Sequence, residues 1–232
     1  MIQGTIIKRP SKHCKSPYVA DVLLENGEEV MAHSPSLGCC GLCEKGSVVF
    51  MLPLQSKICK YSIWLGKKNN ILVGIYPKNA EVITQNYIQH ILPNVKKIQR
   101  ETKILNSRFD FTGNDENNRP FIMEVKSVPL CENNIAYFPD GYRKNKKEVV
   151  SPRALKHIQE LQKIKQETPD YRCILCFVVQ RDDALQFTVN DKDIIYKNAI
   201  IEALQQGVEV MAIKIKWELN ATHSFCGFLP IV

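Results

Sequence analysis

Short segments of alternating or continuous apolar residues, separated by turn-forming residues, recur through the first part of the chain. They span residues 4–8, 19–24, 29–33, 47–52, 61–65 and 71–76. Runs of this length bounded by turn formers are typical of β-strands, and Asn26-Gly27 between two of them is a hairpin signal. Strands this short and closely spaced predict a small barrel. An OB-like barrel is favoured because it commonly presents a groove to oligonucleotides, and a purely structural barrel is the alternative.

The pattern changes after residue 83. Residues 80–95 have helical spacing, and residues 193–206 form a second helical segment that ends at Gly207. Another helix opens at Ser151-Pro152, with Pro in its first turn and one apolar face made by Leu155, Ile158, Leu161 and Ile164. Strands are expected at 108–111, 121–126, 173–179 and 208–215, whereas the polar segment 131–150 is expected to be a loop. Strands alternating with helices predict an α/β domain with a central mixed sheet, and therefore two domains, residues 1–83 and 84–232.

Two of these strands carry acidic residues inside apolar segments. Asp110 lies in the first strand, Glu124 and Lys126 lie in the second, and Gly113 and Asn114 are expected in the loop between them. Residues two apart on a strand point to the same face, so Glu124 and Lys126 share a face that Asp110 can approach from the neighbouring strand.

Two carboxylates in this arrangement suit Mg²⁺ or Mn²⁺, which prefer oxygen ligands and take phosphate as a further ligand. A lysine beside them can orient the attacking water or stabilise charge on a phosphate. Asp110, Glu124 and Lys126 are therefore candidate catalytic residues for phosphodiester hydrolysis. The alternative is that Glu124 and Lys126 form an exposed polar face and Asp110 is a turn residue.

Composition is that of an ordinary soluble protein, with 232 residues, 44% hydrophobic and 24% charged. We expect no transmembrane helix, because no apolar run approaches the length of about 18 residues that spanning requires. Residues 1–7 are too short and polar for a secretory signal, so a cytoplasmic location is expected. The net charge of +7 fits a polyanionic partner, and a basic cluster at Lys144, Lys146 and Lys147 is a candidate contact with a phosphate backbone, or else a solvated surface.

Nine cysteines, an odd number, favour reduced thiols over a disulfide framework. Cys39, Cys40 and Cys43 form the only dense group, and with His33 or Cys59 as fourth ligand they are a candidate zinc site. Small buried or surface thiols are the default interpretation. Cys173 and Cys176 lie three apart in a predicted strand, which places them on opposite faces, so they are not expected to chelate one metal together.

Several blocks of the sequence together resemble the sugar fermentation stimulation protein A family. They are 32–35 (Ala-His-Ser-Pro), 107–111 (Ser-Arg-Phe-Asp-Phe), 124–128 (Glu-Val-Lys-Ser-Val), 156–161 (Lys-His-Ile-Gln-Glu-Leu) and 177–181 (Phe-Val-Val-Gln-Arg). The resemblance runs nearly end to end. It implies an N-terminal OB-like barrel followed by a restriction-endonuclease-like domain, similar to the PD-(D/E)XK nuclease superfamily, in which helices flank the central mixed sheet.

The resemblance also implies site residues. Asp110 and Glu124 would hold the metal with the Val125 carbonyl as a further ligand, Lys126 would be the catalytic lysine, and Glu101 would bind a second ion or position Lys126. Arg108 and Arg181 are candidate nucleic-acid contacts, Arg181 being equally an ion-pair residue, and Gln180 resembles an auxiliary polar residue of the superfamily. For His157, beside the apolar stripe of its helix, we expect a structural or solvated role, with a phosphate contact as the alternative.

These observations predict a nucleic-acid-binding protein with metal-dependent nuclease activity, and with DNA favoured over RNA. The alternative is a non-cleaving DNA-binding regulator of sugar (maltose) utilisation genes. The oligomeric state, the strandedness of the substrate, and endonuclease or exonuclease action stay open.

Overall fold

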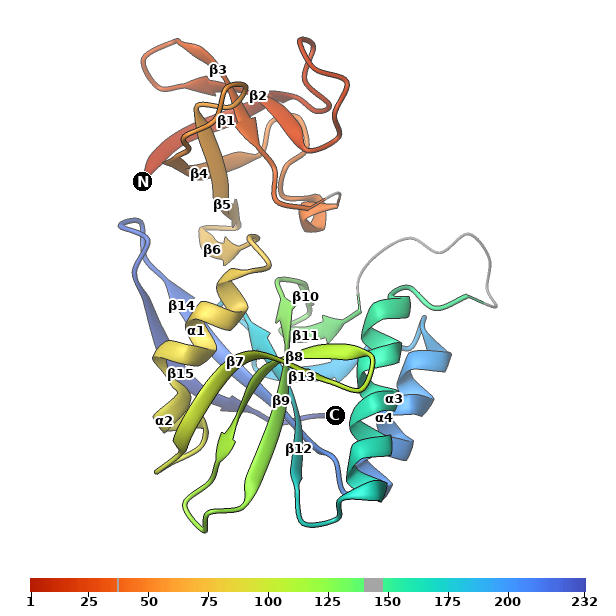
Figure 1. The fold of residues 1–232 in the computed structure, drawn as a ribbon. Helices are drawn as coiled ribbons and strands as arrows, with labels where there is room; N and C mark the ends of the chain where they lie inside the picture. Colours follow the sequence, from red (N-terminus) through yellow and green to blue (C-terminus); the bar gives the residue numbers. More distant parts are fainter. Residues whose placement is uncertain (37, 140–147) are drawn as a thin grey trace. The chain divides into compact units, whose positions relative to one another are not determined.

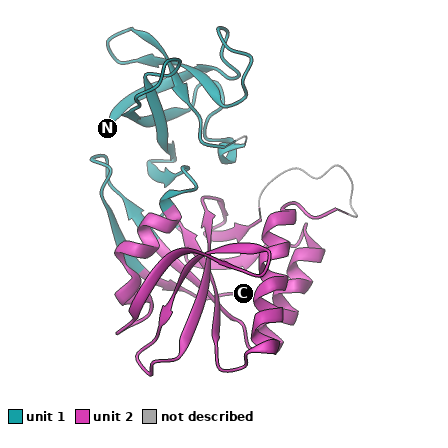
Figure 2. Cartoon of the chain, in the orientation of Figure 1, with its two compact units in different colours: residues 1–79, 180–183, 215–226 teal, residues 80–179, 184–214, 227–232 magenta. Residues whose placement is uncertain are grey.

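The computed structural model describes residues 1–36, 38–139 and 148–232. The chain divides into two compact units (Figure 2), one comprising residues 1–79, 180–183 and 215–226, and the other residues 80–179, 184–214 and 227–232. The sequence predicts a single cut between residues 83 and 84, whereas two later segments also belong to the first unit. Among the described residues, no helix is both long enough and apolar enough to cross a membrane.

The first unit is built on a closed five-stranded barrel (Figure 1), as the sequence predicts. Antiparallel pairing follows the order β3-β2-β1-β4-β5, and a parallel pairing of β3 with β5 closes the barrel. The hairpin between β2 and β3 turns at Asn26-Gly27, where Gly27 has a φ of +84° that a glycine adopts without strain. The strands are β1 (Ile2–Lys8), β2 (Val19–Leu24), β3 (Glu29–His33), β4 (Val48–Pro53), β5 (Tyr61–Lys68) and β6 (Ile71–Gly74), which extends the sheet beyond β5.

Close packing explains one feature of the first unit, the glycine that ends β6. A Cβ at Gly74 would overlap Gln180 Oε1 and Trp217 Nε1, and the Gly74 amide donates to the Gln180 carbonyl at 2.9 Å. Gln180 is fully buried against this glycine. A side chain at position 74 would therefore displace buried neighbours.

The second unit contains the predicted mixed sheet, in the order β15-β14-β12-β9-β8-β7. The central strand β12 runs parallel to β9 and β14, whereas β7, β8 and β9 pair antiparallel. A small second sheet pairs β10, β11 and β13. The strands are β7 (Lys96–Ile104), β8 (Ser107–Asn114), β9 (Pro120–Val128), β10 (Cys131–Glu132), β11 (Ile135–Phe138), β12 (Arg172–Val179), β13 (Gln186–Val189), β14 (Glu209–Trp217) and β15 (His223–Leu229).

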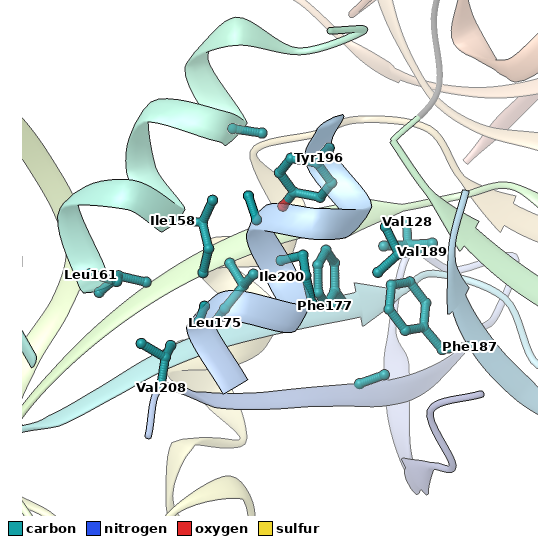
Figure 3. Packing of buried hydrophobic residues seen from close by; sticks show 14 of the residues in the cluster. Val128, Ile158, Leu161, Leu175, Phe177, Phe187, Val189, Tyr196, Ile200 and Val208 are labelled. Carbon is teal, nitrogen blue, oxygen red and sulfur yellow. The ribbon is translucent and has the colours of Figure 1, made fainter. Parts of the chain in front are cut away.

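Helices α3 (Pro152–Glu167) and α4 (Ile194–Gln205) pack against each other beside this sheet (Figure 1). The Ser151 hydroxyl caps α3 by accepting from the Ala154 amide, and Gly207, at φ +85°, follows the end of α4 as predicted. Figure 3 shows the resulting core, in which Ile158 of α3 and Ile200 of α4 gather beside Leu175 of β12. This apolar packing holds α3 in position beside the sheet. It therefore also positions the polar side chains of α3 that face β9.

Several predicted elements differ from the structure. The expected helix over 80–95 is two short helices, α1 (Asn79–Asn86) and α2 (Ile88–Ile91), interrupted at Tyr87, whose φ of −110° is not helical. Gly113 and Asn114 belong to β8, and the turn after them is held by Asp115, whose carboxylate accepts from the Arg119 amide at 2.9 Å. The expected loop over 131–150 contains β10 and β11. The sequence also misses β7, β13 and β15; β7 is almost wholly exposed, so it lacks an apolar alternation.

Cys39 and Cys43 are buried, and the Cys39 thiol lies 3.1 Å from the Ser34 hydroxyl and 3.0 Å from the Ser36 carbonyl. Within the described residues, no group of three or more His, Cys, Asp or Glu side chains is arranged to hold a metal ion. Cys173 and Cys176 are both fully buried in β12.

Candidate active site

The antiparallel pairing of β8 with β9 brings the predicted carboxylates together. Phe111 pairs with Met123, and Asp110 and Glu124 are the next residues on the two strands. The Val125 amide donates to Asp110 Oδ2 at 2.7 Å, which fastens the Asp110 carboxylate to the strand that carries Glu124. The apolar neighbours Phe109, Phe111 and Met123 are fully buried and hold both strands in place.

Glu124 and Lys126 share a face, as their spacing predicts. Glu124 is 2% exposed, and its Oε1 atom contacts both Lys126 Nζ and His157 Nδ1. The Lys126 ammonium also lies 3.3 Å from His157 Nδ1. One carboxylate oxygen, one ammonium and one imidazole nitrogen therefore meet at a single point, so the alternative of an exposed polar face for Glu124 and Lys126 is wrong.

The two carboxylates have opposite electrostatic environments. Burial, followed by the neighbouring charge of Glu124, raises the pKa of Asp110 from 3.8 to about 7. Burial acts in the same direction on Glu124, but the hydrogen bond from His157 and the charge of Lys126 outweigh it and keep the pKa of Glu124 below its usual value. Glu124 is thus compensated by the protein, whereas the Asp110 charge is largely uncompensated.

One buried acceptor at this position has no protein partner. Glu124 Oε2 is shielded from solvent and forms no hydrogen bond with the part of the chain that the structure describes. Satisfied hydrogen bonds are the rule for buried carboxylate oxygens. An unused carboxylate oxygen beside a second, uncompensated carboxylate fits a divalent cation with hard oxygen ligands, and Mg²⁺ is commonly held by only one or two protein carboxylates.

Val125 and Glu101 both lie beside Asp110, Val125 on β9 and Glu101 on β7, between the residues that pair with Phe109 and Phe111. Val125 meets Asp110 through its N–H group and pairs with Cys176 of β12. Glu101 lies on β7, where its half-exposed carboxylate forms an ion pair with Arg108 at 3.1 Å. Glu101 and Arg108 thus neutralise each other at the surface.

The predicted nucleic-acid contacts have separate locations. Arg181 is 4% exposed and makes a two-pronged ion pair with Asp183, at 2.6 and 2.7 Å. This geometry favours the ion-pair interpretation of Arg181 over a contact with a nucleic-acid backbone. Lys144, Lys146 and Lys147 lie outside the described residues.

His157 is the site residue that sequence reasoning undervalued. It is 4% exposed, lies on α3, and contacts side chains of β9 that are more than 30 residues away in the chain. The apolar stripe of α3 indicated burial at this position but gave no indication of the partner. The available signal was that His157 belongs to one of the blocks, residues 156–161, that carried the family resemblance.

With this geometry established, comparison with known proteins places the chain in a family. Residues 78–221 match the family model described as the sugar fermentation stimulation protein RE domain. The chain belongs to the sugar fermentation stimulation protein family. The matched range contains Asp110, Glu124, Lys126 and His157.

The similarity to curated members of the sugar fermentation stimulation protein family extends over both units. A homolog from Crocosphaera subtropica is 31% identical over 89% of this chain and 85% of its own length. A homolog from Desulforamulus reducens is 30% identical over 100% of this chain and 92% of its own. The structure of Pyrococcus furiosus SfsA in complex with Ca²⁺ has a TM-score of 0.81 at 20% identity, covering 100% of this chain and 95% of the other. That likeness confirms the fold predicted from sequence, a barrel followed by a mixed sheet with helices.

Proposed function

We propose that this protein is a metal-dependent nuclease, acting on DNA in preference to RNA, whose active site is the cluster of Asp110, Glu124, Lys126 and His157. The observation that carries the proposal is the buried, unpartnered Glu124 Oε2 beside the Asp110 carboxylate. Two like charges gathered this way are costly without a cation, and a protein that only binds nucleic acid has no evident use for them. The positive net charge supports a polyanionic substrate.

Asp110 and Glu124 would hold Mg²⁺ or Mn²⁺. The ion, when bound, supplies Lewis-acid stabilisation of negative charge on a phosphate. Val125 supports the site through its amide, which keeps the Asp110 carboxylate beside Glu124.

Lys126 is the residue best placed to act on the scissile phosphate. An ammonium group has three N–H donors. Glu124 Oε1 accepts one of them, which leaves donors for the attacking water or a phosphate oxygen. Because the Lys126 side chain is only 12% exposed, its charge acts in a medium of low polarity and stabilises a developing oxyanion more strongly than it would in water. His157 is a positioning residue that holds Lys126 and Glu124 together.

The experiment is cleavage of labelled single- and double-stranded DNA and RNA with Mg²⁺, with Mn²⁺ or with EDTA. Wild type is compared with Lys126→Ala and with the control Lys163→Ala, which removes an exposed lysine of α3 that pairs only weakly with Glu167, at 3.8 Å. We expect metal-dependent cleavage by wild type and the control, and a loss of roughly 10²-fold or more in Lys126→Ala. Binding without cleavage under every metal would reject the nuclease proposal and favour a DNA-binding regulator.

A further inference from the structure

A pocket of about 420 Å³ lies in the second unit, between the start of β8 and the first turns of α3. Asn106, Ser107 and Arg108 line it from β8 and the turn before it, and Arg153, Lys156 and His157 line it from α3. His157 belongs to both the pocket and the Glu124–Lys126 cluster, because its Nδ1 atom contacts Glu124. The pocket therefore adjoins the candidate active site.

The charge of this pocket is positive. Arg108, Arg153 and Lys156 contribute three cations, and none of the described residues that line the pocket is acidic. Two of these cations have an acidic neighbour outside the pocket, Arg108 in its exposed ion pair with Glu101 and Lys156 at 3.9 Å from Glu160. Lys156 Nζ donates to the Asn106 carbonyl at 2.7 Å, which ties α3 to the turn before β8 and fixes the ammonium at the rim. Arg153 is exposed and has no ion pair with any described residue. The pocket lies at the N-terminal end of α3, where the helix dipole adds to the positive potential.

A neutral group in the pocket also indicates a ligand. Ser107 is 6% exposed, and its hydroxyl forms no hydrogen bond with the residues that the structure describes. A buried hydroxyl without a partner costs stability, so its presence is explained if a ligand supplies the partner. Three cations and a hydroxyl donor are the groups that recognise a phosphate.

We propose that this pocket is a phosphate subsite, which holds a phosphate group of the nucleic-acid strand beside the phosphodiester at the Glu124–Lys126 cluster. The assignment rests on the proposed function for its substrate, and it adds Ser107, Arg153 and Lys156 to the substrate-binding residues. Contacts to phosphate carry no base information. The subsite therefore fixes the register of the strand relative to Lys126 without selecting a sequence.

The test measures binding of short labelled oligonucleotides in EDTA, where no cleavage occurs, as a function of salt. The variants are Arg153→Gln, Lys156→Gln and their double, and the matched control is Lys163→Gln on the same helix. Each lost phosphate contact should reduce the slope of log K against log salt by about 0.7 for single strands and 0.9 for duplex DNA. Arg153 is exposed and forms no ion pair with a described residue, so Arg153→Gln is not expected to disturb the fold. An unchanged slope in the double variant would overturn the subsite.

Ser107→Ala gives a second measurement, because a purely structural role of Ser107 would lower the melting temperature, whereas a role in phosphate binding would lower only the affinity. Loss of a hydrogen bond to a charged phosphate should weaken binding about tenfold. The melting temperature should stay the same or rise, because the hydroxyl has no protein partner. A lower melting temperature with unchanged affinity would contradict the proposal.

The same assay distinguishes a terminal phosphate of the strand from an internal phosphodiester. Oligonucleotides with a 5′-phosphate, a 3′-phosphate or hydroxyls at both ends are compared with a circular strand. Preference for one phosphorylated end, lost in the double variant, identifies a terminal phosphate; equal binding of all four, weakened in the double variant, identifies an internal phosphodiester. Cleavage is measured separately, so the two proposals fail separately. A reduced slope with no cleavage by wild type rejects the nuclease alone, and cleavage with an unchanged slope rejects the subsite alone.

Discussion

Replacement of Asp110 by Asn tests whether the active site stores an uncompensated negative charge. The amide oxygen of Asn can still accept from the Val125 amide, so the substitution removes the charge and retains the hydrogen bond. In metal-free protein, Asp110→Asn should therefore be more stable than wild type at neutral pH, although Asp110 is a proposed metal ligand.

The magnitude and its pH dependence follow from the raised pKa of Asp110. A carboxyl whose pKa is about 7 in the folded state and 3.8 when unfolded binds protons more tightly when folded. Its contribution to stability is fully present below about pH 4, and it is lost as pH rises to about 7, in total about 4 kcal/mol. Because Asn does not titrate, the difference in unfolding free energy between Asp110→Asn and wild type should grow by about that amount across this window.

Urea unfolding in EDTA at several pH values between 4 and 8 measures this difference. Every other titrating group is common to both proteins, so subtraction isolates Asp110, and any constant effect of the amide appears as an offset. A difference that stays flat over this range would refute the argument that burial and Glu124 raise the pKa of Asp110.

Three further outcomes are expected. Mn²⁺ at about 100 times its Kd should raise the unfolding free energy of wild type by about 2.7 kcal/mol in a thermal or urea titration. Glu124→Gln should show no such rise. An equal rise in the variant would place the ion elsewhere. Arg181→Ala should lower stability by roughly 1.5–3 kcal/mol, because it removes the charged hydrogen bonds of the buried arginine to the partly exposed Asp183. Its salt dependence of DNA binding should match wild type, and a reduced slope would restore Arg181 as a backbone contact. His157→Gln should lower kcat roughly 10²-fold and leave KM nearly unchanged, since His157 positions Lys126; a change confined to KM would contradict that role.

The strands of the barrel, helices α3 and α4, and the shared face of Glu124 and Lys126 could all be predicted from the sequence. Each depends on local periodicity: apolar alternation in a strand, a stripe on a helix, or a two-residue spacing. The approach of Asp110 was also predictable, because a hairpin pairs strands that are neighbours in the chain. Among the elements that were missed, β7 and β15 are the two edge strands of the sheet, and β7 is almost wholly exposed and leaves no apolar pattern.

Only the tertiary structure decided which side chains from distant segments meet. His157 joins Glu124 because the apolar face of α3 packs beside the sheet, and Arg153 and Lys156 line one pocket with Ser107 for the same reason. Arg181 forms its ion pair with Asp183 in the first unit, and the family block that contains Arg181 did not identify this partner. The amino-acid sequence by itself determined, through local spacing, that Asp110, Glu124 and Lys126 lie close together. The position of His157, the ion-pair partners of Arg108 and Arg181, and the pocket beside α3 depend on long-range packing, which periodicity does not encode.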